Sequence, residues 1–162
     1  MSPEAPSNVD VDLAHRHFSA DCFNRTWTLI EKVHRTPADT EAMVLCALAS
    51  LWHWTQRADR TDRNLSIGHW QVARVYAFVG QGENAMLHAQ RSLELAEGSP
   101  PFYVGYAHEA MARAALLLKD RERFQAHLNR ARECAAAVTE AEERQPLDQD
   151  LRLLESSGGP TA

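Results

Sequence analysis

Apolar residues recur at helical intervals along nearly the whole chain. Near the start, apolar residues such as Leu13, Phe18, Trp27 and Ile30 recur at roughly helical intervals. This pattern predicts a first helix over residues 10–34. Strict alternation of apolar and polar residues, the signature of a strand, is not what these intervals show.

Helix-start and helix-stop signals divide the rest of the chain. Thr36 is a plausible N-cap, followed by Pro37 in the first turn and Asp39 three residues after the cap. Asp120 is a second plausible N-cap. Pro146 is expected to interrupt the helical pattern before a short last helix. Further helices are therefore predicted over residues 37–56, 66–79, 83–96, 103–118, 121–141 and 147–155, with a polar connection over 57–64.

Two segments, 69–97 and 108–136, are imperfect copies of one pattern, related by a shift of 39 residues (108 minus 69). Self-similarity at such a period is typical of stacked-repeat proteins, in which each unit buries its apolar face against its neighbours. The identical positions are His69/His108, Ala73/Ala112, Arg74/Arg113, Glu83/Glu122, His88/His127, Arg91/Arg130 and Glu94/Glu133.

The small, apolar and turn positions of the first copy are Val72, Ala73, Tyr76, Gly80, Ala85, Ser92 and Leu93. In this order they resemble a tetratricopeptide repeat, with a glycine turn between two helices and an alanine where the helices touch. Residues 108–135 match less well, because Lys119 stands at the glycine position and Phe124 at the alanine position. A weaker third copy covers residues 24–54.

The resemblance implies an all-α fold, an α-α superhelix of about six or seven helices stacked as antiparallel pairs. Leu147, Leu151 and Leu154 would place the last helix as a cap over the open end of the stack. The predicted organisation is a disordered N-terminus over 1–8, a single domain over 9–155 with repeats at about 20–56, 66–98 and 103–137 and a capping helix at 147–155, and a disordered tail over 156–162.

The resemblance also implies that the first helix of each repeat lines a concave groove. Guanidinium groups beside aromatic rings suit a peptide carboxylate or an acidic side chain, with an apolar anchor next to it. Alternatively, Arg74 and Arg113 form ion pairs with Glu31 and Glu109 inside the stack. The groove positions would be Trp70, Arg74, Phe78, Tyr106, Glu109 and Arg113, and the first repeat would add Asn24, Trp27, Glu31 and His34.

We therefore predict a non-catalytic module that binds a protein or peptide in this groove. The alternative is a small-molecule sensor or a small enzyme with a closed pocket near Trp54, Trp70, Tyr106 and His108. No nucleophile and base form a recognisable catalytic motif, and no cofactor is predicted. An open groove favours the first reading, whereas a closed cavity favours the second.

The repeated histidines, His69, His88, His108 and His127, raise the possibility of a metal site. However, none of the histidines forms the four-residue spacing of a helical zinc site. We predict no metal, and expect each histidine to fill the same gap between helices. The glycines of the segment 80–85 match a dinucleotide-binding string, but a helix precedes them where that motif needs a strand, so a helix–helix turn is predicted.

Composition narrows the class of protein further. The chain has 162 residues and a net charge of −5, which suits one domain and argues against a nucleic-acid partner. Cys22, Cys46 and Cys134 are far apart and odd in number, which indicates free thiols and a reducing compartment. With no apolar run of membrane-spanning length and no signal-peptide pattern, we expect a cytoplasmic protein with no membrane partner.

The predicted first helix carries apolar residues on more than one face, including Val9, Leu13, Phe18, Phe23 and Trp27. Extended apolar patches seldom stay exposed, so another element or another chain should cover them. A symmetric homodimer is the commonest solution, although the helix could instead fold back over its own repeat.

Overall fold

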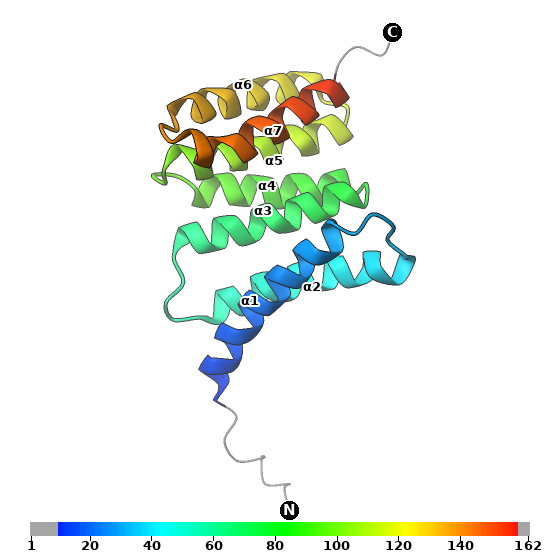
Figure 1. Cartoon of the computed structure of the whole chain (residues 1–162), viewed down its shortest axis with the longest axis vertical. Helices are drawn as coiled ribbons and strands as arrows, with labels where there is room; N and C mark the ends of the chain where they lie inside the picture. Colours follow the sequence, from blue (N-terminus) through cyan, green and yellow to red (C-terminus); the bar gives the residue numbers. More distant parts are fainter. Residues whose placement is uncertain (1–9, 159–162) are drawn as a thin grey trace, which may run out of the picture. The chain divides into compact units, whose positions relative to one another are not determined.

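The computed structural model describes residues 10–158, and this part of the chain is all-α, with seven helices and no strand (Figure 1). The all-α fold is thus as predicted, whereas the segment 1–8 lies outside the described residues. The helices are α1 Val11–Ile30, α2 Pro37–Gln56, α3 Asp62–Phe78, α4 Gly82–Leu95, α5 Pro101–Leu117, α6 Arg121–Ala137 and α7 Ala141–Gly158.

The contacts divide the chain into two compact units, with the division between Arg60 and Thr61. The N-terminal unit contains α1 packed against α2. In the C-terminal unit α3 pairs with α4 and α5 with α6; α5 also packs on both helices of the preceding pair, and α7 lies against α5 and α6 (Figure 1). Antiparallel helix pairs are therefore the building block of both units, while the single domain over 9–155 stays a prediction.

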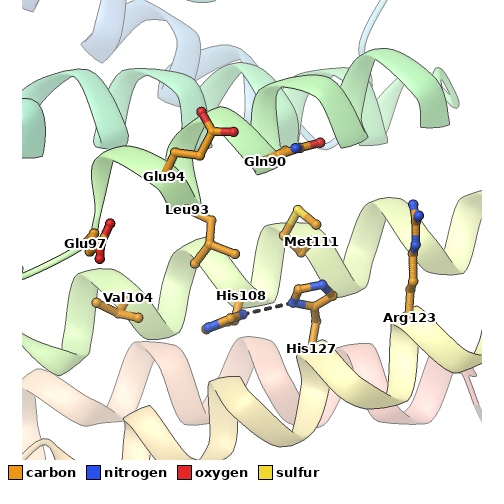
Figure 2. A pocket seen from close by; sticks show the side chains of 9 residues that line it. All are labelled: Gln90, Leu93, Glu94, Glu97, Val104, His108, Met111, Arg123 and His127. Carbon is orange, nitrogen blue, oxygen red and sulfur yellow. Dashed lines mark hydrogen bonds between the residues drawn. The ribbon is translucent and has the colours of Figure 1, made fainter.

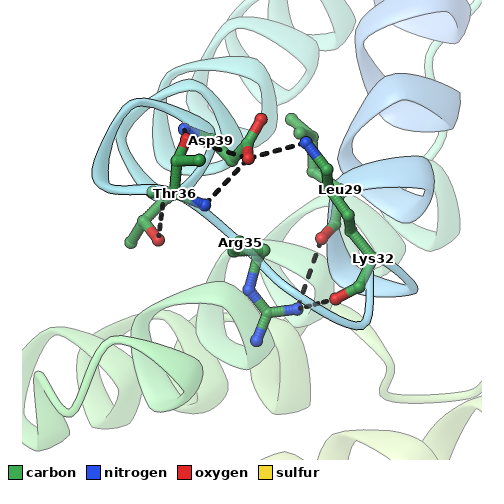
Figure 3. Close-up of polar contacts among 6 residues, drawn as sticks. Leu29, Lys32, Arg35, Thr36 and Asp39 are labelled. Atoms are coloured by element: carbon green, nitrogen blue, oxygen red, sulfur yellow. Dashed lines mark hydrogen bonds and ion pairs between the residues drawn. The ribbon is translucent and has the colours of Figure 1, made fainter.

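The start of α2 follows the predicted capping signal. The Thr36 hydroxyl accepts a hydrogen bond from the Asp39 backbone N–H at 3.1 Å, and the Asp39 carboxylate accepts one from the Thr36 N–H at 2.9 Å. This capping box is closed by Lys32, whose Nζ lies 2.7 Å from Asp39 (Figure 3). These hydrogen bonds, the Lys32 contact foremost, lower the pKa of Asp39 to about 2.

The predicted end of α1 at His34 was wrong, because the helix ends at Ile30. The side chain of Arg35 explains this, since its Nη1 donates to the carbonyl oxygen of Leu29 at 3.3 Å (Figure 3). It also donates to the carbonyl oxygen of Ile30 at 2.6 Å. It thereby satisfies carbonyls that the last turn of a helix leaves without a partner.

The start of α3 also differs from the prediction. Three residues that were assigned to the polar connection, 62–64, are helical, because Thr61 and Asn64 form a second capping box. The apolar pattern begins only at Leu65, so a start placed by hydrophobic periodicity falls one turn late.

The turns that end α3 and α5 share one geometry. Gly80 has a φ of +75° and Lys119 a φ of +59°, in the left-handed region. The N–H of Gln81 reaches the Tyr76 carbonyl at 2.9 Å, and the same six-residue bond joins Asp120 to Ala115 at 3.0 Å. Both are Schellman turns, so Lys119 takes the backbone conformation for which the repeat uses glycine.

The prediction that Pro146 interrupts the helical structure was wrong. Helix α7 runs through Pro146 from Ala141 to Gly158, and includes three residues of the tail that was predicted to be disordered. Pro146 is exposed and lies near the start of the helix, so only one backbone hydrogen bond is lost. Meanwhile Leu147, Leu151 and Leu154 are almost fully buried and hold the helix in place.

The cores of the two units differ in size. In the C-terminal unit a cluster of buried alanines allows close approach of α3, α4, α5 and α6, and α7 adds its three leucines to that cluster. In the N-terminal unit the buried apolar residues are Met43, Ala47 and Leu51. The C-terminal unit therefore holds most of the hydrophobic stabilisation of the described chain.

Candidate functional site

The predicted groove residues of the C-terminal unit gather on the side of α3 and α5 that faces α7. Arg74 of α3 reaches Asp150 of α7, with Nη1 and Nη2 lying 3.2 and 3.1 Å from the two carboxylate oxygens. The side chains of Arg74 and Asp150 are only 14% and 18% exposed. Burial alone would lower the pKa of Arg74, but the carboxylates of Glu109 and Asp150 raise it above its ordinary value.

Arg113 pairs with Glu109 one turn earlier on α5. Its Nε donates to Glu109 Oε1 at 2.8 Å and its Nη2 contacts the same oxygen. The Glu109 side chain is 1% exposed, and its Oε2 accepts no hydrogen bond from the described residues. Internal pairing is thus found for both arginines, although the partner of Arg74 is Asp150 rather than the predicted Glu31. No sequence signal marked Asp150.

Trp70 and Tyr106 form the aromatic part of the cluster. Their rings meet edge to face with centroids 5.0 Å apart, and the Arg74 guanidinium lies 5.7 Å from the Trp70 ring. Burial raises the pKa of the Tyr106 phenol above its ordinary value, and the nearby Asp150 carboxylate adds to this. The phenol therefore stays protonated at neutral pH.

A cavity of about 160 Å³ lies beside this cluster, between α3, α5 and α7. Arg74, Arg113 and Phe78 line it together with Leu117 and Leu154. The structure thus brings three of the six predicted binding residues into one cavity. Trp70 and Tyr106 are not among its lining residues, and Glu109 is buried.

The four first-repeat positions belong to the N-terminal unit. Asn24 and Trp27 lie on α1 as predicted, but Glu31 and His34 follow the end of that helix, so their assignment to its groove face was wrong. Trp27 contacts Phe23 with ring centroids 6.4 Å apart. These positions therefore do not continue one helix face as the resemblance implied.

The alternative pocket is not found as predicted. His108 lines a cavity of about 650 Å³ between α4, α5 and α6, but neither Trp70 nor Tyr106 does (Figure 2). Trp54 belongs to the N-terminal unit, where the Arg57 guanidinium lies 3.8 Å from its ring. The residues lining the cavity are Gln90, Leu93, Glu94, Glu97, Val104, His108, Met111, Arg123 and His127.

The histidines pair with one another across each helix pair. His69 and His88 join α3 to α4 with their Nδ1 atoms 2.9 Å apart. His108 and His127 join α5 to α6 with the same Nδ1–Nδ1 distance of 2.9 Å (Figure 2). The equivalent histidines thus fill the same gap between helices, as expected. Sequence reasoning missed the pair that joins α1 to α2, in which the Nδ1 atoms of His15 and His53 lie 2.8 Å apart.

Burial keeps these imidazoles neutral. It lowers the pKa of His69 and of His108 to about 4, helped in each case by the paired histidine. Burial also lowers the pKa values of His88 and His127. Among residues 10–158, no group of three or more histidine, cysteine, aspartate or glutamate side chains could hold a metal ion.

No protein-family model, no curated protein and no solved structure matches the chain. Within the described part of the chain, no helix has the length and apolarity needed to cross a membrane.

Proposed function

We propose that this protein is a non-catalytic interaction module of tetratricopeptide-like helix pairs, and that the cavity between α3, α5 and α7 binds an acidic peptide. The guanidinium of Arg113 carries the proposal. Its Nε and Nη2 both donate to Oε1 of Glu109, whereas its Nη1 has no hydrogen-bond partner among the described residues. Arg113 is 24% exposed and lines the cavity, so this N–H can reach a ligand carboxylate.

The walls of the cavity suit the rest of such a ligand. Phe78 and Leu117 are exposed apolar residues beside the two arginines, and offer a surface for an apolar side chain next to the carboxylate. The Asp150 carboxylate on α7 already binds the guanidinium of Arg74, and a ligand carboxylate would bind that of Arg113 in the same way. A C-terminal carboxylate and an acidic side chain would both fit.

A pair of synthetic peptides tests this proposal. We expect the acetylated tetrapeptide Ala-Leu-Leu-Glu with a free C-terminus to shift the NMR signal of the Arg113 Nε–H, and its amidated Gln analogue not to. Arg113→Lys keeps a charge beside Glu109 but loses the fork, so it should weaken binding by about tenfold, as loss of a charged hydrogen bond does. Arg130→Lys, in an exposed pair with Glu133, is the matched control. Equal and unsaturable shifts with both peptides would exclude this site.

The alternative, a small-molecule sensor, is supported by the 650 Å³ cavity lined by His108 and His127, whose volume falls within the range of small-molecule sites. NMR titration distinguishes the two sites. A ligand that binds in the cavity between α4, α5 and α6 would shift the imidazole signals of His108 and His127 and leave the Nε–H signal of Arg113 unchanged.

The predictions of a homodimer and of a cytoplasmic location remain proposals. Leu13 and Phe18 on α1 are 63% and 44% exposed, which supports contact with a second copy of the chain. The thiols of Cys22, Cys46 and Cys134 are all unbridged, which suits a reducing compartment.

A further inference from the structure

The histidine pairs of the C-terminal unit can each hold only a limited number of protons. In a neutral pair, one Nδ1 carries hydrogen and donates to the lone pair of the other Nδ1. A first added proton can go to the outer nitrogen of the donor ring and leave this bond intact. A second added proton must go to the acceptor, so that two N–H groups and two positive charges face each other.

We propose that His69–His88 and His108–His127 are proton-sensitive latches, in which uptake of the second proton breaks the Nδ1–Nδ1 hydrogen bond and loosens the helix pair that it joins. Each latch spans the two helices of one repeat, α3 with α4 and α5 with α6. The two pairs occupy equivalent positions, with the same Nδ1–Nδ1 distance of 2.9 Å, so both are expected to respond over the same range of pH.

The surroundings of the first pair do not stabilise a doubly charged state. Tyr76 of α3 packs on the His88 ring with centroids 5.7 Å apart. On α4, Arg91 and Glu94 act on His69 with opposite signs, and they form an ion pair with each other at 2.9 Å. Their effects on the pair therefore largely cancel.

The second pair has a similar charge balance. Arg130 and Glu133 on α6 act on His108 with opposite signs and pair at 2.7 Å, while Arg123 of α6 disfavours the charged form of His127. Across the cavity, α4 contributes Glu94 and Glu97, which are both exposed to solvent. Solvent screens these two carboxylates, so burial remains the main effect on the pair.

The direction of the response follows from proton linkage. Because the pKa of His69 and of His108 is about 4 in the folded chain and about 6.5 in an unfolded one, the unfolded chain binds more protons between these values. The stability contributed by the neutral pairs is complete above pH about 6.5. It is lost as the pH falls from about 6.5 to about 4.

Urea unfolding of the full chain at pH about 7.5 and about 5.5 tests the latches. In the double variant His69→Gln, His108→Gln, a glutamine can hydrogen-bond to the remaining imidazole but cannot be protonated. We expect acid to increase the unfolding equilibrium constant of the wild-type C-terminal unit about 100-fold more than that of the variant, about tenfold for each pair. The control is His34→Gln, which replaces an exposed histidine outside the helices. An equal acid response of wild type and double variant would overturn the proposal.

A second measurement needs no variant. In the folded wild-type chain, ¹⁵N NMR of the imidazole rings should show His69 and His108 titrating near pH 4, well below the ordinary value for histidine. Loss of the helix-pair contacts should accompany this second step, detected as faster amide exchange in α4 and α6. Titration of His69 and His108 at the ordinary value for histidine would refute the latches even if the double variant did not fold.

Discussion

Each arginine of the repeated pair is neutralised by a different kind of partner. Arg113 is bound to a glutamate on its own helix, whereas Arg74 is bound to an aspartate on α7. The difference lies in burial, because the Glu109 side chain is almost inaccessible while Asp150 retains some contact with water. Equivalent positions in a repeat can therefore contribute very different free energies of folding.

This difference predicts the outcome of two substitutions. Arg113→Ala leaves a buried carboxylate without its counter-charge and should lower the free energy of unfolding by about 3 kcal/mol, as expected for breaking a buried pair. Arg74→Ala should cost less, since water can solvate Asp150. Urea unfolding measures both, with Arg130→Ala as the exposed control. A larger effect of Arg74→Ala than of Arg113→Ala would contradict the assignment.

At the residue scale, the sequence predicted which residues occupy equivalent positions in the repeat better than it predicted which side chains contact one another. The repeat correctly placed His69 with His108, and Arg74 with Arg113, at equivalent sites on the helices. The partner of Arg74 could not be predicted, because the contact with Asp150 links residues far apart in the chain. The pairing of His15 with His53 also lacked a signal, since His15 lies outside the weaker third copy over residues 24–54.

At the scale of the helices, local capping chemistry decides where each element begins and ends. Thr36 with Asp39 and Thr61 with Asn64 start two helices with the same box of hydrogen bonds. The first box was recognised in the sequence because proline followed it, and the second was missed. Buried leucines, in turn, outweigh the local effect of Pro146 in α7.

The two Schellman turns allow a matched prediction. Lys119 adopts a φ of +59° that costs a non-glycine residue about 1 kcal/mol, so Lys119→Gly should raise the free energy of unfolding by up to about that amount. Gly80→Ala, at the equivalent turn with a φ of +75°, should lower it by a similar amount. Thermal unfolding checks both, and a stabilising Gly80→Ala would argue against the left-handed turn.

At the scale of the whole molecule, the all-α class and the helix pairs could be predicted from periodicity and repetition alone. The division into two units could not, because it follows from the tertiary contacts, which the spacing of apolar residues does not specify. In the N-terminal unit the buried polar residues, Ser19, Thr26 and Ser50, are as numerous as the buried apolar ones. Its hydrophobic driving force is correspondingly smaller.

We therefore predict that the N-terminal unit is the less stable of the two. Its buried apolar residues are few, and an isolated helix pair of this length is near the lower limit for independent folding. In the C-terminal unit, by contrast, α5 packs against α3, α4, α6 and α7. Amide hydrogen exchange on the full chain should show protection in α1 and α2 at least tenfold lower than in α5, an effect of about 1.4 kcal/mol or more in opening free energy.

The cap boxes give an internal control for that experiment. Thr36 and Thr61 begin helices in different units with the same hydrogen-bonding pattern, so local capping alone would protect α2 and α3 equally. If burial sets the stability, Thr36→Ala should increase exchange only in α1 and α2, and Thr61→Ala should leave these two helices unchanged. Exchange of all the helices at one common rate, with both substitutions accelerating every amide together, would show instead that the chain opens as one cooperative body.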